Sequence, residues 1–486
     1  MSTPRQAAIF DLDRTLIAGS SSVVLARHLD QAGLTGSLPA ALMGGWNRAY
    51  EQWGDSWMTM GLARLAAPAA RSWAVAKVAT AAAAAAPELA ASVLPFARQE
   101  LEAQRRAGRL LVLATATPEP LIAPFARLLG FDGVVATRWA TENGNYLGAT
   151  EGPFLYGAEK LRAVQRWAEE HNVALAHSVA YSDSAFDEPL LAGVGSAVVI
   201  NPDPHLAVLA RLRGWPVRHF DVPPGVVKLA GYELQDWLRP YNRPELLPAR
   251  FSFTGQEHIP AHGPAIVVFN HRSYFDATVI NLLMARVRRS ARFLAKKELT
   301  DAPILGPLTR ALGAIRVERA SGSDEPLAAA AACLAAGELI CMAPQGTIPR
   351  GPAFFDPELV GRWGAARLAA LSGAPVIPVG LWGTEAVWPR NARVPRLDLR
   401  RPKISVTVGP PVILARSGAR KAPDTDANTR TIMAAIVALL PEQARQPHMA
   451  TEEELARTYP PGYLGDAASE HKRRPGRDTM APTRCA

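Results

Sequence analysis

Cysteine is scarce in this sequence and follows no recognisable pattern. The 486 residues include three cysteines, Cys333, Cys341 and Cys485. Their spacing matches neither a zinc-binding motif nor the paired framework of a disulfide-stabilised secreted domain. We therefore predict a protein of a reducing compartment.

The sequence also lacks a long apolar run. The residues between Arg5 and Asp11 are too few for the apolar core of a signal peptide. The charge-free stretches 31–47 and 368–384 are shorter than the roughly 20 residues that a membrane-spanning helix needs, and both contain polar or helix-breaking residues. We predict no signal peptide and no transmembrane helix.

Acidic residues are the minority among the charged ones. The chain has 53 Lys and Arg against 44 Asp and Glu, which gives a formal net charge of +9. Such an excess suits nucleic acid, an anionic membrane surface or phosphorylated substrates. Because no nucleic-acid-binding module is present and the arginines are scattered, we predict no nucleic-acid partner.

The composition and length predict a folded chain of more than one domain. Hydrophobic residues make up 48% and charged residues 20%, and the chain is too long for one core. A Pro-rich linker occupies 222–250, where the amphipathic stretch 226–238 predicts a helix packed on the next domain or, as the alternative, on a membrane surface. The domains then span 1–221 and 251–445, and a polar, flexible tail covers 446–486.

The first chemical signal is a pair of acids at the end of a predicted strand. Residues 7–10 are apolar, and Asp11 and Asp13 follow directly. Two carboxylates so close together repel each other unless a cation lies between them, and Mg²⁺ is the natural candidate. The alternative is a strand that ends in a solvated turn, and this stretch alone does not separate the two interpretations.

Other strands of the first half also end in polar groups. A second apolar strand ends at Thr115, and a third is followed by Asp183 and then Asp187. Lys160 lies on a predicted helix between them, where a lone lysine is usually solvated. Alternating strands and helices predict a parallel sheet, whose ligand crevice lies at the carboxyl ends of the strands. We expect these groups to converge there.

The rest of the first half has little strand signal. Residues 20–105 are rich in alanine and predict helices, with a break at Pro87. Residues 134–139 predict a further strand, with Gly144 and Gly148 in turns.

These features resemble the haloacid dehalogenase-like phosphatase superfamily, and within it the subgroup that contains phosphoserine phosphatases. The resemblance covers roughly residues 6–220 and rests on four motifs in order. It implies a Rossmann-like parallel sheet with a helical cap formed by about residues 20–105.

The resemblance also implies roles for these residues. Asp11 would be the nucleophile that forms an aspartyl-phosphate, and Asp13 the acid that protonates the leaving group and later activates water. Thr115 and Lys160 would hold phosphoryl oxygens. A Mg²⁺ site would be formed by Asp11, Asp13, Asp183 and Asp187.

In the second half, an apolar strand over 265–269 runs into Asn270 and His271, with Asp276 five residues further on. A single His near an acid is more often structural than catalytic. A turn entering a helix would nevertheless bring the two into contact. A carboxylate that binds one imidazole nitrogen fixes the tautomer and leaves the other nitrogen as a base.

Further blocks follow at 313–319, which ends in Arg319, at 343–347 (Ala-Pro-Gln-Gly-Thr), and at 376–379. Together with the His–Asp block they resemble the glycerolipid acyltransferase family, in particular lysophosphatidic acid acyltransferases, over roughly residues 250–415. The resemblance implies a second α/β domain.

The family mechanism would make His271 the general base for the acceptor hydroxyl, with Asp276 orienting it. The acyl donor would be acyl-CoA or an acyl-carrier protein. The acceptor phosphate would be held by Arg319, Gln345, Gly346 and Thr347, because a guanidinium and a group of main-chain N–H donors suit a dianion.

The third block departs from the family pattern Pro-Glu-Gly-Thr-Arg. The Glu is Gln345 and the Arg is Ile348, with Arg350 two positions later. Gln keeps the size and hydrogen-bonding reach of Glu but loses its charge. The acceptor is therefore left open among lysophosphatidic acid, another lysophospholipid and a different alcohol.

Together the two halves predict a bifunctional enzyme of phospholipid biosynthesis, peripheral on the cytoplasmic face of the membrane. One alternative keeps the acyltransferase and makes the first half a small-molecule, phosphoserine-like phosphatase. Another makes the first half a non-catalytic module that docks on membranes or partners.

Overall fold

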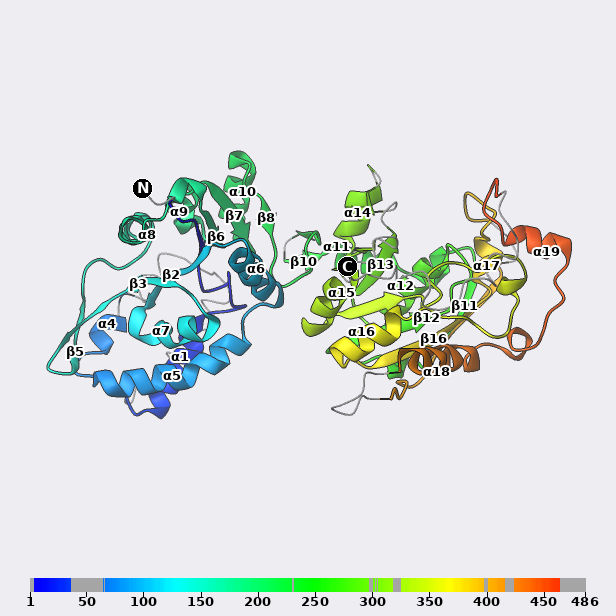
Figure 1. Ribbon diagram of the computed structural model, residues 1–486, viewed down its shortest axis with the longest axis horizontal. Coiled ribbons are helices and arrows are strands. Elements are labelled where there is room, and N and C mark those ends of the chain that lie inside the picture. The colour runs from blue at the N-terminus through cyan, green and yellow to red at the C-terminus, as the bar shows by residue number, and fades with distance from the viewer. Residues whose placement is uncertain are drawn as a thin grey trace, which may run out of the picture. The chain divides into compact units, whose positions relative to one another are not determined.

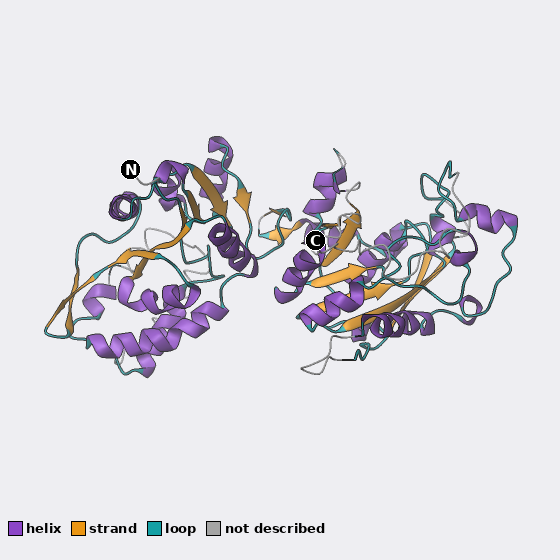
Figure 2. Ribbon diagram, in the orientation of Figure 1, coloured by secondary structure: helices purple, strands orange, loops and turns teal. Residues whose placement is uncertain are grey.

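The computed structural model describes residues 4–35, 64, 66–229, 231–296, 300–301, 303, 305–317, 325–396, 401–415 and 424–463. The chain divides into two compact units, Met1–Pro224 and Gly225–Ala486, each built from strands and helices (Figures 1 and 2). The division lies close to the predicted domain end at residue 221. Both units are α/β, as the sequence predicts.

A six-stranded parallel sheet forms the centre of the first unit, in the order β3-β2-β1-β6-β7-β8. Its strands are β1 Ala7–Phe10, β2 Leu110–Pro118, β3 Gly133–Thr137, β6 Val179–Ser182, β7 Ser196–Ile200 and β8 Val217–Arg218. The chain adds strands first on one side of β1 and then on the other. The crevice at such a switch point lies at the carboxyl ends of β1 and β6, directly before Asp11 and Asp183.

The described helices of the first unit are α1 Ser21–Gln31, α4 Ala66–Ala69, α5 Val75–Ala91, α6 Pro95–Arg106, α7 Glu119–Leu129, α8 Ala158–Glu170, α9 Glu188–Ala192 and α10 Pro204–Arg213, with the 3-10 turns η1 Leu175–His177 and η2 Ala185–Asp187. α5 packs against α1 and α7, whereas α6 packs against β2 (Figure 1). The helices predicted for 20–105 are therefore present where the structure describes this stretch, and residues 36–63 lie outside it.

The predicted break at Pro87 is wrong, because Pro87 lies inside α5. Proline removes one main-chain hydrogen bond and usually ends a helix. Here alanines with high helix propensity precede the proline, and one face of the helix is buried on both sides of it. That face consists of Val78, Ala81, Ala82, Ala85, Ala86, Leu89 and Ala90.

A β-hairpin that the sequence analysis misses follows β3. Its strands are β4 Trp139–Glu142 and β5 Asn145–Thr150, and Asn143 and Gly144 form the turn with φ angles of 49° and 79°. An Asn-Gly pair with both φ angles positive is the preferred two-residue hairpin turn, so the signal was present in the sequence.

The second unit contains a seven-stranded sheet in the order β11-β17-β16-β12-β15-β13-β14. Only the β16–β17 pair among these strands is antiparallel. The strands are β11 Arg250–Thr254, β12 Ala265–Phe269, β13 Ala291–Lys296, β14 Ile315–Val317, β15 Leu339–Met342, β16 Val376–Trp382 and β17 Lys403–Val408. β12, which precedes His271, lies in the middle of the sheet and is buried along its whole length.

The described helices of the second unit are α11 Leu234–Leu238, α12 Asp276–Arg286, α14 Leu305–Ala311, α15 Glu325–Ala335, α16 Gly364–Ser372, α17 Thr384–Val387, α18 Thr425–Ala438 and α19 Glu452–Arg457. The 3-10 turns are η3 Arg239–Tyr241, η4 Pro244–Leu246, η5 Gln256–His258, η6 Gly351–Phe354 and η7 Glu442–Ala444. α16 and α18 pack against each other and against the sheet (Figure 1). No helix in the described part of the chain is long and apolar enough to cross a membrane.

The segment predicted as a linker belongs to the second unit, and the helix predicted over 226–238 is wrong. β9 Lys228–Leu229 and β10 Tyr232–Glu233 form a small hairpin around Gly231, and only α11 is helical. Glu233 binds the buried guanidinium of Arg292 with contacts of 2.6 and 2.7 Å. These contacts fix the segment to β13.

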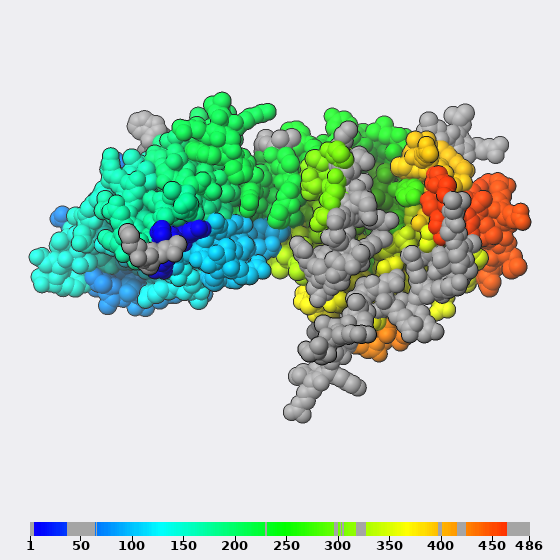
Figure 3. All heavy atoms as spheres, turned by 45° about the horizontal axis from the view of Figure 1, so that its top comes forward, coloured from blue at the N-terminus to red at the C-terminus, as the bar shows by residue number. Residues whose placement is uncertain are grey.

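The prediction of a flexible tail from residue 446 is wrong for residues 446–463. α19 lies at the surface of the second unit, coloured orange-red in Figure 3. Thr458, which is buried, accepts a hydrogen bond from the main-chain N–H of Gly351 at 2.8 Å. A capped helix and a buried threonine therefore anchor this part of the predicted tail. Residues 464–486 lie outside the described residues.

Candidate functional site

In the first unit, a buried lysine joins two of the predicted acids. Lys160 Nζ lies 2.7 Å from Asp11 Oδ1 and 2.7 Å from Asp187 Oδ2. Ser182, the last residue of β6, donates a hydrogen bond to the same oxygen of Asp187 at 2.7 Å. The prediction that Asp11 and Lys160 meet is therefore confirmed, and Lys160 is not the solvated lysine of the alternative.

The charge of Lys160 is maintained by its two partners. Burial lowers the pKa of a lysine, but the carboxylates of Asp11 and Asp187 outweigh burial here, so the pKa of Lys160 is raised. The side chain is 4% exposed. The site therefore holds a fixed ammonium group beside Asp11 throughout the neutral pH range.

Asp13 is oriented by the start of α1. The main-chain N–H of Ser21 donates to Asp13 Oδ1 at 2.5 Å, and the Ser21 hydroxyl lies 3.2 Å from Asp13 Oδ2. The same hydroxyl contacts the hydroxyl of Thr117 at 3.2 Å. Thr115, predicted as a phosphate ligand, lies on the same strand and accepts a hydrogen bond from the Thr117 N–H at 3.1 Å. The end of β2 is thus linked to Asp13 through Thr117, which the sequence analysis misses.

Asp183 completes the cluster from the end of β6. Its Oδ1 accepts a hydrogen bond from the Thr15 hydroxyl at 3.2 Å, and Arg14 Nε lies 3.4 Å from its Oδ2. Arg14 has a φ of 57°, a left-handed conformation that a non-glycine residue rarely adopts. The loop after β1 therefore brings both a guanidinium and a hydroxyl to Asp183.

The four acids predicted as Mg²⁺ ligands are not gathered into one cluster in the described part of the chain. Among the described residues, no three Asp, Glu, His or Cys side chains are gathered into a metal cluster. Asp187 binds Lys160 and Ser182, and Asp13 binds Ser21. Asp11, which also binds Lys160, and Asp183, which binds Thr15 and Arg14, lie at the ends of the adjacent strands β1 and β6. Their hard carboxylate oxygens, with the Thr15 hydroxyl nearby, suit Mg²⁺ in chemistry.

In the second unit, His271 and Asp276 are in direct contact, as predicted. His271 Nδ1 lies 2.7 Å from Asp276 Oδ2. The main-chain N–H groups of Arg272 and Ser273 donate to the same oxygen at 2.7 and 2.8 Å. Asp276 is fully buried, whereas the His271 side chain is 27% exposed. A buried carboxylate that holds Nδ1–H leaves Nε2 as the basic nitrogen.

The residue after His271 fixes this loop to its surroundings. The guanidinium of Arg272 lies 4.3 Å from the ring centroids of both Phe354 and Trp382. Its Nε and one terminal nitrogen donate to Glu385 Oε1 at 3.1 and 2.9 Å. Two cation–π contacts and a charge-assisted pair hold the loop. No role was predicted from the sequence for Arg272 or Glu385, which lie 113 positions apart.

Gln345 makes a contact that was not predicted from the sequence. Its Oε1 accepts a hydrogen bond from the main-chain N–H of His271 at 2.6 Å. The accepting atom must be oxygen because the partner is a donor. Gln345 therefore positions the His271 loop, and the phosphate contact predicted for it stays a prediction. Glu would offer the same acceptor, which explains how the departure from the family pattern is tolerated.

Gly346 and Thr347 follow in the same turn, where Gly346 has a φ of 73°. Arg319, the predicted phosphate-binding arginine, lies outside the described residues.

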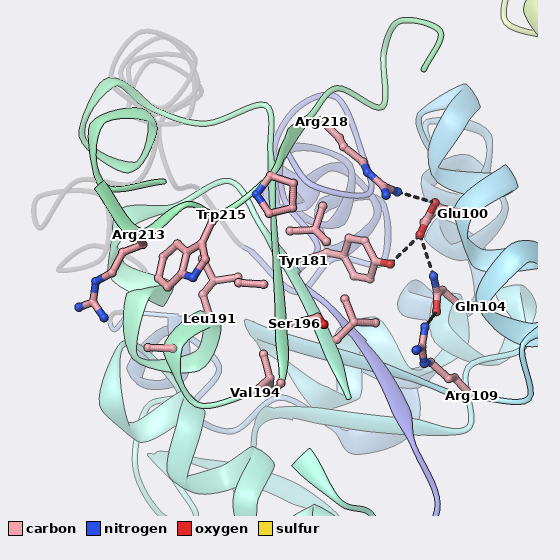
Figure 4. A pocket seen from close by; sticks show the side chains of 16 residues that line it. Glu100, Gln104, Arg109, Tyr181, Leu191, Val194, Ser196, Arg213, Trp215 and Arg218 are labelled. Carbon is pink, nitrogen blue, oxygen red and sulfur yellow. Dashed lines mark hydrogen bonds and ion pairs between the residues drawn. The ribbon is translucent and has the colours of Figure 1, made fainter. Parts of the chain in front are cut away.

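Described residues line two cavities, one in each unit. One of about 650 Å³ is lined in part by Glu100, Tyr181 and Trp215, where Glu100 accepts hydrogen bonds from Tyr181 and Gln104 (Figure 4). None of the predicted site residues lines it, so we assign the chemistry to the strand ends instead. The second, of about 380 Å³, lies in the second unit and is lined in part by Ala277, Met284 and Phe293.

Two family models match the chain. Residues 8–192 match the haloacid dehalogenase-like hydrolase model, and residues 250–382 match the acyltransferase model.

Relatives with known names align with part of the chain. An inhibition of morphological differentiation protein of Streptomyces azureus is 33% identical over 230 residues, which cover 46% of this chain and 81% of that protein. A probable phosphatase of Mycobacterium tuberculosis is 34% identical over 227 residues, covering 45% and 77%. A solved 1-acyl-sn-glycerophosphate acyltransferase of Thermotoga maritima is 22% identical with a TM-score of 0.34, covering 42% of this chain and 78% of that one.

Proposed function

Because the chain belongs to the haloacid dehalogenase-like hydrolase family and also carries an acyltransferase domain, we propose that it is a bifunctional enzyme of phospholipid biosynthesis. The second unit transfers an acyl group from acyl-CoA or an acyl-carrier protein to a lysophospholipid such as lysophosphatidic acid. The first unit hydrolyses a related phosphomonoester. The observation that carries the proposal is the 2.7 Å contact between His271 and Asp276 at the end of β12.

In the acyltransferase reaction, His271 Nε2 takes the proton from the acceptor hydroxyl. The oxygen then attacks the thioester carbonyl, an ester bond forms, and the thiolate leaves and is protonated. Asp276 holds the imidazole and stabilises the cation that forms on it. Gln345 and Arg272 keep the loop in place through the contacts described above.

In the phosphatase reaction, a carboxylate oxygen of Asp11 attacks phosphorus, and the substrate's alcohol leaves with a proton from Asp13. Water, with Asp13 as base, then releases phosphate from Asp11. Lys160 lowers the cost of the negative charge gathered around Asp11. Bound Mg²⁺, held by Asp11 and Asp183, would supply further charge neutralisation.

The cavity of about 380 Å³ in the second unit supports an acyl substrate. Small or apolar side chains dominate its walls, among them Ala277, Met284, Phe293 and Leu312. Apolar walls suit a hydrocarbon chain.

An exposed surface supports the proposal of peripheral membrane association. Between residues 227 and 246 the exposed apolar and aromatic side chains are Val227, Tyr232, Trp237, Leu238, Tyr241 and Leu246. Arg243 is exposed among them. We call this surface the 227–246 patch. Aromatic and basic groups together suit the interface of an anionic bilayer.

The Tyr241→Ser, Leu246→Ser double variant is expected to bind vesicles of anionic phospholipid about 30-fold more weakly, because each side chain contributes on the order of 1 kcal/mol of apolar burial. Vesicle co-sedimentation measures this. The matched control is Val208→Ser, Leu212→Ser, which removes two exposed apolar side chains from α10. Equal binding by the patch variant and the wild type would contradict membrane contact through the patch.

Variants of Gln345 test its positioning role. Gln345→Glu keeps an acceptor for the His271 N–H and is expected to retain kcat for acyl transfer within about threefold. Gln345→Leu leaves that N–H unsatisfied, which costs roughly 1–3 kcal/mol, and is expected to lower kcat about 10- to 100-fold. A Leu variant with wild-type kcat would show that Gln345 does not position the base.

The proposal is tested by offering radiolabelled acyl-CoA with a panel of lysophospholipids and, separately, phosphatidic acid and phosphoserine. We expect acylation of lysophosphatidic acid and release of phosphate from phosphatidic acid. Phosphate release from phosphoserine alone would favour the small-molecule phosphatase. Acylation of none of the panel would overturn the acyltransferase assignment.

A further inference from the structure

Residues 446–463, which we call the C-terminal segment, follow the part of the chain that matches the acyltransferase model, because that match ends at residue 382. The segment includes α19, which contacts the 3-10 turn η6. The mechanism proposed above assigns the segment no role. Its hydrogen bonds nevertheless lead back to the loop of His271 and Asp276 along two separate routes.

The first route runs through η6. The Thr458 hydroxyl accepts a hydrogen bond from the main-chain N–H of Gly351 at 2.8 Å and donates one to the carbonyl oxygen of Leu455 at 2.7 Å. Gly351 begins η6 and Phe354 ends it. The Phe354 ring centroid lies 4.3 Å from the guanidinium carbon of Arg272. The C-terminal segment therefore holds the turn that carries one of the two rings in contact with Arg272.

The second route runs through the stretch 388–392, which follows α17. The carbonyl oxygen of Arg457 accepts a hydrogen bond from the main-chain N–H of Asn391 at 3.3 Å. In the same stretch, the carbonyl oxygen of Trp388 accepts one from the Ser273 hydroxyl at 2.6 Å. Trp388 Nε1 donates to the carbonyl oxygen of Ala392 at 3.0 Å, which ties the stretch together. Adjacent residues of the C-terminal segment thus reach the catalytic loop through two different parts of the chain.

Both routes end at residues whose main-chain groups hold the carboxylate of the His–Asp pair. The N–H groups of Arg272 and Ser273 donate to Asp276 Oδ2 at 2.7 and 2.8 Å. The same oxygen lies 2.7 Å from His271 Nδ1. A shift of either N–H group therefore changes the orientation of the base. Misplacement of a reacting group by about 1 Å can cost on the order of 10²-fold in rate.

We propose that Thr458 is a positioning residue of the acyltransferase site, through which the C-terminal segment fixes the His271 loop. The proposal rests on the acyltransferase function proposed above and concerns how the base is held, with no contact to either substrate. The Thr458 side chain is 2% exposed, and its hydroxyl both donates and accepts. A buried hydroxyl whose hydrogen bonds are all made specifies one position for η6, whereas apolar packing alone tolerates small shifts.

Thr458→Val keeps the shape of the side chain and removes both hydrogen bonds. It is expected to lower kcat for acyl transfer about tenfold, with KM for both substrates within about twofold of the wild type. Thr458→Ser keeps the hydroxyl and should restore kcat to within about threefold. Thr431→Val is the matched control, because Thr431 is exposed on α18 and its hydroxyl donates to the carbonyl oxygen of Ala427 in the same helix.

A double-mutant cycle separates positioning of the base from a general loss of structure. In the His271→Ala background the base is absent, so Thr458→Val should change the residual rate less than twofold. A loss of about tenfold in that background as well would overturn the proposal, because the effect of Thr458 would then not pass through His271.

Hydrogen exchange measures the positioning without reference to any acyl acceptor. Thr458→Val is expected to speed exchange of the N–H groups of Arg272 and Ser273 at least tenfold, because their loop opens more often. Unchanged exchange or unchanged kcat would overturn the proposal. If Thr458→Val does not fold, Phe354→Leu decides by the same two measurements. A wild type that transfers no acyl group would refute the proposed function, while the exchange rates would still decide the positioning role.

Discussion

Replacing Asp11 with Asn is expected to reduce phosphate release about 10⁴-fold or more, while acyl transfer stays unchanged. The amide has the shape of the carboxylate but lacks its nucleophilic charge, and loss of a nucleophile removes most of an enzyme's chemical rate. Phosphate release from phosphatidic acid and from phosphoserine, followed in both variant and wild type, measures the effect.

Asp11→Asn should fold normally because Lys160 keeps its second partner, Asp187, at 2.7 Å. Lys160→Met is the contrasting variant. It would leave two buried carboxylates without their cation, which costs roughly 3–5 kcal/mol of stability. If Asp11→Asn retained full phosphate release, the non-catalytic docking module would be the better account of the first unit.

The pH dependence follows from the raised pKa of Lys160. Because the folded pKa lies above the unfolded value of about 10.4, the protonated lysine contributes its full stability below that pH. This contribution to stability is lost only as the pH rises through the pKa of Lys160 in the folded protein. If phosphatase activity falls as the pH is raised toward about 10, the loss therefore comes from the titration of a group other than Lys160.

Replacing His271 with Ala is expected to lower kcat for acyl transfer about 10³-fold, with phosphate release unchanged. A general base typically contributes 10²–10⁴-fold, and without it the acceptor hydroxyl keeps its proton during attack. Transfer of a radiolabelled acyl group to lysophosphatidic acid measures this loss.

Asp276→Asn is the companion variant. The carboxylate accepts three hydrogen bonds at one oxygen, including that of His271 Nδ1. An amide in its place would favour the wrong imidazole tautomer, so a comparable loss is expected with little change in KM. Wild-type transfer by His271→Ala would show that another group is the base.

The meeting of the main site residues could be predicted from the sequence. Asp11 and Asp183 each directly follow an apolar strand, and Thr115 lies near the end of another. Parallel strands bring their carboxyl ends to one edge. His271 and Asp276 lie on a single strand-to-helix turn, so their contact also has a local cause.

The division of roles within each cluster could not be predicted. Which carboxylate faces Lys160 depends on how α8 packs, and sequence spacing does not distinguish Asp187 from Asp183 as its partner. The bond between Gln345 and the His271 N–H joins positions 74 residues apart. Only the pairing of β12 with β15 brings them together.

The helix over 226–238 and the break at Pro87 fail for a related reason. Local propensity predicts both, but Gly231 allows a hairpin turn, and burial on both sides of Pro87 outweighs the lost hydrogen bond.

The measurement that tests the central claim most directly is a parallel assay of both reactions in the wild type, Asp11→Asn and His271→Ala. The account predicts that each variant loses one reaction and keeps the other within about twofold, because each unit holds a complete set of reacting side chains. Two results would contradict the presence of two independent active sites. One is a folded variant that loses both reactions, and the other is that both variants keep both reactions.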